Sequence, residues 1–259
     1  MLKFCSLFSG SSGNSFFVTD GDTNVLIDSG VSKKKILDSL QSMDIDNIDA
    51  ILVTHEHIDH VSSLDTLSSH FKIPVYANKK TWEAMISKKD KIKNQKIFNM
   101  LETFEIGNLK IFPFPLPHDA AAPCGFNIFE SNEKLSIATD LGHVNNKTFD
   151  YFLGSSSILL EANYSPEMLK VSPYPYLLKQ RISNPLGHLS NDEAGNTISR
   201  LINSGLKSAL LVHLSKTNNF SDLAYKTVEE KINESNSSTT NFNINIAPRD
   251  EPSKLLQAN

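Results

Sequence analysis

An apolar segment leads directly into four potential metal ligands, and this junction restricts the chain to folds that present a strand end at a cleft. Residues 48–54 predict a buried strand, and the next six residues are His55-Glu56-His57-Ile58-Asp59-His60. His55 and His57 are two residues apart, so their rings point to the same side of an extended segment. Asp59 and His60 follow at a turn and address a second position nearby. We therefore expect a two-metal centre, an arrangement common in the hydrolysis of phosphodiesters.

Two ions need more ligands than this run supplies, and three later strand ends provide candidates. His118 follows an apolar segment at 111–116, Asp140 follows one at 135–139, and His213 closes one at 209–212. All donors are nitrogen or oxygen, which suits zinc, manganese or iron and leaves the metal open. The alternative interpretation is that some of the eight histidines are only surface residues, and His70 is interpreted in this way.

Alternating strand and helix patterns predict one α/β domain over residues 1–259. Strands are expected at 3–8, 16–19, 24–27, 48–54, 74–77, 101–106, 109–115, 124–131, 134–139, 157–162, 208–213 and 242–247. Helices are expected at 32–43, 62–70, 146–153, 191–203 and 222–234, with another beginning near residue 80. Residues 233–241, rich in Asn, Ser and Thr, predict a mobile loop.

Charge and cysteine content exclude few classes of protein. The net charge of −4 works against a large basic surface for nucleic acid, but bound metal ions reverse the sign of a site locally. Two cysteines in no paired pattern favour a reducing cytoplasm over a disulfide framework. No apolar run is long enough to cross a bilayer, and the N-terminus predicts a first strand instead of a signal peptide.

The ligand pattern resembles a known family. Thr54-His55-Glu56-His57-Ile58-Asp59-His60, with His118, Asp140 and His213, is similar to the HxHxDH pattern and later motifs of the metallo-β-lactamase superfamily. This resemblance covers nearly the whole chain and implies an α/β (α+β) fold, a four-layer αββα sandwich with two divalent metals at one edge of the paired sheets. In that pattern His55, His57 and His118 hold one metal, Asp59, His60 and His213 hold the other, and Asp140 bridges them.

A narrower resemblance, to the bacterial YycJ (WalJ) group, rests on several longer strings. These include Ser9-Gly10-Ser11-Ser12-Gly13-Asn14, Leu160-Glu161-Ala162-Asn163, Gly187-His188-Leu189-Ser190-Asn191 and His213-Leu214-Ser215-Lys216. The group is associated with 5′→3′ exonuclease action on double-stranded DNA. The resemblance implies a duplex with a 5′ end as partner, cleaved with a metal-activated hydroxide. His143 departs from the group, where an aromatic residue is expected.

The catalytic prediction pairs His188 with Asp59. His188 lies in a loop before a helix, and its layout resembles the histidine of tRNA 3′-processing endonucleases that is thought to protonate the leaving group, a general-acid role. The alternative is a histidine that packs this loop or caps the helix. Substrate-binding candidates, each with a simple surface or turn alternative, are Ser12, Asn14, Lys179, Arg181 and Lys216.

Several functions stay open at this level. The first rival to the exonuclease is a phosphodiesterase for a small cyclic or phosphonate-derived ester, which the acidic balance and lack of a basic arm favour. Thioester or lactam hydrolysis would leave the His188 loop unexplained. A metal-holding regulatory module without turnover is the rival from another class. The sequence leaves the native metal, endonuclease against exonuclease action, and monomer against homodimer undecided.

Overall fold

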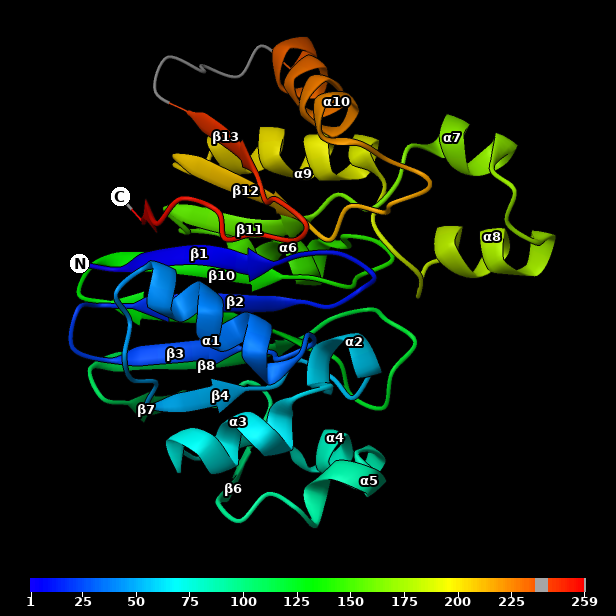
Figure 1. The fold of residues 1–259 in the computed structure, drawn as a ribbon. Coiled ribbons are helices and arrows are strands. Elements are labelled where there is room, and N and C mark those ends of the chain that lie inside the picture. The colour runs from blue at the N-terminus through cyan, green and yellow to red at the C-terminus, as the bar shows by residue number, and fades with distance from the viewer. Residues whose placement is uncertain (236–241, 259) are drawn as a thin grey trace.

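The strands form two seven-stranded sheets in the computed structural model, which describes residues 1–235 and 242–258 (Figure 1). The first sheet has the order β14-β1-β2-β3-β4-β5-β6 and the second the order β13-β12-β11-β10-β9-β8-β7. The strands of the first sheet are β1 (Lys3–Phe8), β2 (Ser15–Thr19), β3 (Asn24–Ile27), β4 (Ala50–Leu52), β5 (Val75–Asn78), β6 (Gln95–Phe98) and β14 (Leu256–Gln257). Those of the second are β7 (Phe104–Ile106), β8 (Leu109–Pro115), β9 (Cys124–Glu130), β10 (Glu133–Ala138), β11 (Ser157–Glu161), β12 (Ser208–Val212) and β13 (Asn243–Ile246).

Each sheet is antiparallel in one part and parallel in the other. Strands β3 to β6 are parallel in the first sheet, and β10 to β13 are parallel in the second. Parallel strands end at the same edge of their sheet, so side chains that follow them gather there. This edge positions the candidate site.

The helices are α1 (Lys33–Ser42), α2 (Ile58–Val61), α3 (Leu64–Phe71), α4 (Lys79–Ala84), α5 (Ile86–Lys89), α6 (Asn146–Phe152), α7 (Pro166–Val171), α8 (Tyr176–Ser183), α9 (Asn191–Ile202) and α10 (Ser221–Glu234). Within the described residues, none is long and apolar enough to span a bilayer. The ends of the helices follow ordinary capping chemistry: Ser32 and Ser190 each accept a backbone N–H in the first turn.

Three apolar clusters hold the layers together. The central cluster lies between the sheets and includes Phe4, Phe16 and Phe126, all fully buried. A second cluster packs α1, α3 and α4 on the outer face of the first sheet, and a third packs α6, α9 and α10 on that of the second. The expected four-layer αββα sandwich is confirmed.

Several elements differ from the predictions for identifiable reasons. The strand expected at 101–106 begins only at Phe104, because Leu101 has a positive φ of 66° and turns the chain. Strand β6 was not predicted, since three of its four residues are exposed and show no alternation. Helices α7 and α8 were missed because prolines flank these short, largely exposed segments. The mobile loop expected at 233–241 overlaps α10 at its start, and residues 236–241 lie outside the described residues.

Candidate metal centre

The seven predicted ligands converge at the carboxyl edge of the two sheets. His55 follows β4, and the next ligands lie at the start of α2 and within it. His118 follows β8, Asp140 follows β10, and His213 follows β12. Segments far apart in sequence therefore contribute to one cluster, in which His55, His60, His118, Asp140 and His213 are all buried.

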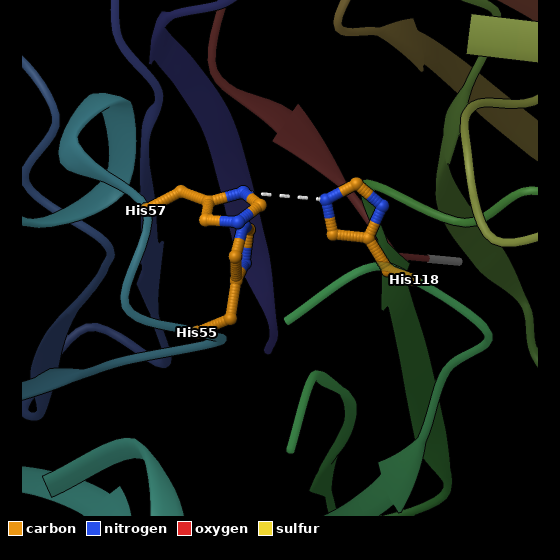
Figure 2. A group of neighbouring side chains, drawn as sticks. All are labelled: His55, His57 and His118. Carbon is orange, nitrogen blue, oxygen red and sulfur yellow. Dashed lines mark hydrogen bonds between the residues drawn. The ribbon is translucent and has the colours of Figure 1, made fainter. Parts of the chain in front are cut away.

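His55, His57 and His118 form a first group, whose ligand atoms lie within 4.8 Å of one another. Figure 2 shows His57 and His118 facing each other, with Nδ1 of His57 3.4 Å from Nε2 of His118. His118 Nδ1 lies 2.9 Å from the Gly187 carbonyl, which can only accept, so Nδ1 carries the proton and Nε2 is left for a metal. Burial lowers the pKa of both His55 and His118, which favours the neutral, metal-binding imidazole.

Asp59, His60 and His213 form a second group with the same mutual spacing. Asp59 Oδ2 lies 3.6 Å from His60 Nε2 and 3.9 Å from His213 Nε2. The other ring nitrogens are held from behind: His60 Nδ1 by Asp28 at 2.8 Å and His213 Nδ1 by Glu161 at 2.6 Å. A carboxylate behind a metal-binding imidazole fixes its orientation and increases its basicity.

Asp140 lies between the two groups. Its Oδ2 is 3.1 Å from His60 Nε2, and its Oδ1 is 3.9 Å from His118 Nε2. Burial alone would raise the pKa of Asp140, but the charges of His213 and His60 outweigh it and hold the pKa well below its usual value. An ionised carboxylate with one oxygen toward each group has the position of a bridging ligand.

The cluster contains buried polar atoms that lack partners. Among the described residues, His55 Nε2 and His213 Nε2 are buried and form no hydrogen bond. Buried polar atoms are normally paired, so two such atoms in one cluster need another partner. Divalent cations with nitrogen and oxygen ligands fit this donor set, and zinc, manganese and iron all remain compatible with it.

The backbone around the ligands is tightly packed. Asp28, Asp140 and His213 have positive φ angles of 61°, 54° and 60°, and each turns the chain where a strand ends. Gly30 lies so close to the ligand run that an added Cβ would meet the carbonyl oxygen of Asp59 at 1.6 Å. These contacts fix the direction in which the ligand side chains leave the strands.

Two functional carboxylates were missed by sequence reasoning, Asp28 and Glu161. Glu161 is fully buried; its Oε1 accepts from Nδ1 of His188 at 2.8 Å and of His213 at 2.6 Å. Burial alone would raise the pKa of Glu161, but its histidine partners lower this pKa to about 2. Burial alone would lower the pKa of His188, but Glu161 raises it to about 9. Both carboxylates end apolar strands, the same signal that indicated Asp140.

A cavity of about 140 Å³ opens onto the cluster. Residues from both groups line it together with Ser11, Asp119, Leu178, Arg181, Ile182, Gly187 and His188. Arg181 donates from Nε to Asp119 at 2.6 Å, which leaves the rest of its guanidinium at the rim of the cavity. The part of the cavity wall that includes Arg181 comes from α8, a helix that was not predicted.

The structure does not bring all predicted substrate-binding residues to this cavity. Asn14 is buried, with Nδ2 3.1 Å from His60 Nε2, so it contacts the ligand groups directly. Ser12 lies in a neighbouring hollow. Lys179 donates to the Lys170 carbonyl at 2.8 Å, and neither Lys179 nor Lys216 lines the cavity.

His143, where the sequence departs from the resembled group, contacts the loop that carries His188. Its Nδ1 lies 2.8 Å from the carbonyl oxygen of Pro185 and donates to it, since a carbonyl only accepts. The residue therefore has a structural contact at this position, beside the site and not among its ligands.

The curated proteins that are similar to this chain include two exodeoxyribonucleases. Exodeoxyribonuclease WalJ of Streptococcus pneumoniae serotype 2 is 36% identical over 236 residues, covering 89% of this chain and 88% of that relative. Exodeoxyribonuclease YycJ of Bacillus anthracis is 34% identical over 237 residues, covering 90% of each chain. Both names agree with the group that the sequence strings resemble.

Comparison with solved structures shows the same fold at low sequence identity. The metallo-β-lactamase fold protein YhfI from Bacillus subtilis superimposes with a TM-score of 0.74 at 15% identity, covering 97% of this chain and 98% of that chain. The short form of human tRNase Z gives a TM-score of 0.65 at 15% identity, covering 98% and 99%. The profile described as "Metallo-beta-lactamase superfamily" matches residues 9–204. The chain therefore belongs to the metallo-β-lactamase superfamily.

Proposed function

We propose that this protein is a metal-dependent 5′→3′ exodeoxyribonuclease that acts on double-stranded DNA. The observation that carries the proposal is the cluster of two complete ligand groups with His188 beside them. The names of the two relatives, at 34–36% identity over about nine tenths of the chain, support a nuclease role. The duplex form of the substrate and the 5′ polarity come from the resemblance.

The metal assignment follows the two groups. His55, His57 and His118 would hold one ion, Asp59, His60 and His213 would hold the other, and Asp140 would serve both. Two bound divalent ions would supply an activated water and positive charge for the phosphate oxygens. Zinc and manganese are the first metals to test, with iron as a third. All seven ligands come from one chain, so the proposed chemistry needs no homodimer.

His188 is placed to donate a proton to the leaving 3′-oxygen. Its Nδ1 is occupied by Glu161 at 2.8 Å, so Nε2 is the nitrogen available to a group in the cavity that His188 lines. An alkoxide is a poor leaving group unless it is protonated, and a positioned acid contributes about 10²–10⁴-fold to such a step. Glu161 acts as a positioning residue because it holds both His188 and the ligand His213.

The size of the cavity is consistent with a substrate that lies mostly outside it. At about 140 Å³ it is smaller than the roughly 300–1,000 Å³ of ordinary small-molecule sites. A phosphate group enters such a space, while the attached nucleotides remain at its mouth. Arg181 on the rim is proposed to contact a phosphate there by two-pronged hydrogen bonds.

The two cysteines agree with action in the cytoplasm, which we include in the proposal. Both cysteines are buried and unpaired, as expected in a reducing compartment. Neither lies among the proposed ligands. Oxidation of these thiols is therefore not needed for folding or for the proposed activity.

The deciding experiment compares two substrates with protein loaded in turn with manganese and zinc. Mononucleotides released from the 5′ end of a 5′-phosphorylated duplex are the expected products. Cleavage of a cyclic nucleotide without cleavage of the duplex would favour the small-molecule phosphodiesterase instead. Absence of hydrolysis of both substrates and of bis-p-nitrophenyl phosphate, with the metal fully loaded, would favour a metal-holding module without turnover.

A further inference from the structure

The lysines of the chain are unevenly distributed. Residues 72–96 contain eight lysines and two acidic residues, a formal charge of +6. Because the net charge is −4, the rest of the chain carries −10. This stretch runs from the end of α3 through β5, α4 and α5 to β6, at the β6 end of the first sheet (Figure 1). A local excess of this size creates a positive field that the net charge conceals.

A shallow hollow lies beside the metal centre and is lined by residues of α1 and α2. It adjoins the central cavity at Ser11 and Asp59, which line both. Lys35 of α1 and Ser62, directly after α2, also line it. The hollow therefore leads from the proposed ligand Asp59 to the start of α3.

A second hollow continues along α3. Lys88 of α5 lies between the two hollows and contacts a lining residue of each: its Nζ donates to the Ser62 carbonyl at 2.5 Å and pairs with Asp65 at 2.9 Å. Asp65 lines the second hollow together with Lys33 and Lys91. The ion pair with Lys88 neutralises this carboxylate.

A third hollow lies at the far end of α3. It shares Ser69 and Lys91 with the second, and Lys72 and Lys93 line it as well. We call the three hollows together the α3 groove. The three hollows follow one another from beside the metal centre along α3, whose eight residues span roughly 12 Å.

The basic side chains of the α3 groove are available to a ligand. The groove lysines, which are Lys33, Lys35, Lys72, Lys91 and Lys93, form no ion pair with any carboxylate in the described part of the chain. All except the partly buried Lys33 are exposed. The ammonium group of Lys35 lies 5.6 Å above the ring of Phe8, which directs it without neutralising it.

We propose that the α3 groove binds the phosphate backbone of duplex DNA and leads its end to the metal centre. This inference rests on the proposed function and adds the path of the substrate. Lysine and serine side chains are typical phosphate contacts, and α3 spans roughly three or four base-pair steps of 3.4 Å. An acidic protein partner is disfavoured, because the core of a protein interface needs aromatic or aliphatic anchors. The groove has Val31, Ile58 and Ile73 at its two ends, and no such residue lines its middle hollow.

The test compares two triple variants that lose the same charge. One is K33Q/K91Q/K93Q in the groove, and the other is K110Q/K147Q/K226Q, in which the three exposed lysines belong to the second sheet and its helices. Each metal-loaded protein is titrated into a labelled 5′-phosphorylated duplex with phosphorothioate ends, and fluorescence anisotropy is followed between 50 and 200 mM salt. Hydrolysis of bis-p-nitrophenyl phosphate measures how much of each preparation has an intact metal centre.

The groove variant is expected to bind the duplex at least tenfold more weakly at 0.1 M salt. The slope of log affinity against log salt concentration is expected to become shallower by ~2.7, because each of the three lost phosphate contacts contributes about 0.9 to this slope. The control variant should keep the wild-type slope, because its lysines lie outside the groove and the effect of distant charges is screened.

Equal slopes and affinities for the two variants would overturn the proposal. So would a groove variant that loses binding to polyglutamate while its duplex binding is normal, which assigns the groove to an acidic protein. If the wild type binds duplex through the groove yet cleaves no DNA, the groove proposal stands and the exonuclease proposal fails. The two failures are therefore distinguishable.

Discussion

Replacing Glu161 by glutamine removes one charge at the centre of the site and keeps the size of the side chain. Glu161 uses both oxygens: Oε1 accepts from the rings of His188 and His213, and Oε2 accepts from the backbone N–H groups of Leu141 at 3.0 Å and Leu189 at 3.1 Å. Glutamine has one oxygen and one NH₂ group. The backbone N–H groups can only donate, whereas a neutral imidazole nitrogen can also accept, so the amide oxygen is expected to face the backbone and the NH₂ group to face the histidines. The two hydrogen bonds from the His188 and His213 rings to a carboxylate oxygen are then lost.

The magnitude follows from the contacts that are lost. A hydrogen bond to a charged group contributes about 1.5–3 kcal/mol, and about 1.4 kcal/mol corresponds to a tenfold change in affinity. Loss of the bond to His213 should therefore weaken metal binding by about 10- to 100-fold, the range found for partners of metal-binding histidines. Loss of the bond to His188 should lower turnover in the fully loaded enzyme by a further 10²–10⁴-fold, roughly the contribution of a positioned acid.

The assay separates these two effects. Metal affinity is measured by competition with a chromophoric chelator, and turnover is measured on duplex DNA at saturating metal. Glu193→Gln is the matched control. Glu193 lies on α9, accepts from the backbone N–H of Val144 at 3.0 Å, and contacts no ligand histidine. In a His188→Ala background, Glu161→Gln should cause no additional loss of turnover, since the group it positions is gone.

The reasoning would be refuted by a Glu161→Gln enzyme whose metal affinity and turnover stay within threefold of wild type. It would also be refuted if the losses caused by Glu161→Gln and His188→Ala multiplied fully in the double variant. In that case Glu161 would act on turnover by a route other than His188.

Three further predictions concern other parts of the site. His188→Ala should retain both metals but lose about 10²–10⁴-fold in turnover, measured by metal analysis and duplex cleavage; unchanged turnover would remove His188 from the mechanism. Gly30→Ala should destabilise the fold by at least about 1–3 kcal/mol in denaturant titrations and reduce metal content, because the new Cβ overlaps Asp59. Gly154→Ala is the control: its Cβ meets no atom within 4 Å, but its φ of 76° strains the backbone, so it should lose some stability and keep its metal content. Normal metal binding by Gly30→Ala would contradict the packing argument. Removal of metal by a chelator should lower the unfolding midpoint, since an ion present at 1,000 times its Kd stabilises the fold by about 4 kcal/mol. The shift should be smaller in His213→Ala, which keeps the ligand group of His55, His57 and His118. An equal midpoint with and without chelator in the wild type would argue against a bound ion.

Most of the sheet structure was predictable because buried strands have continuous apolar patterns. The strand at 157–162 is one such case, and its observed counterpart β11 is buried at every residue. Elements that bury little have no such pattern. Strand β6 pairs with one neighbour only, and α8 has a single buried residue, Ile182, so their sequences predict neither element.

The candidate site was predictable to the extent that its residues have unusual chemistry. Histidines in fixed spacing stand out, and all seven proposed ligands do lie in one cluster. Glu161 and Asp28 were missed because a carboxylate at the end of a strand is common, and only a folded structure shows which imidazole nitrogen it contacts. Distances between segments far apart in sequence decide such roles.

The ligand cluster alone cannot decide the substrate, because one fold and one metal site serve many reactions in a superfamily. The parts that distinguish a long duplex from a small ester lie outside the cluster. These are the small cavity, Arg181 on α8, and the lysines of the α3 groove. A small ester would not need the lysines that line the hollows along α3, beyond the cavity at the metal centre. The overall charge of −4 favoured a small ester, because it is the sum of +6 over residues 72–96 and −10 over the rest of the chain. The distribution of charge over the folded surface, and not its sum, is what favours nucleic acid.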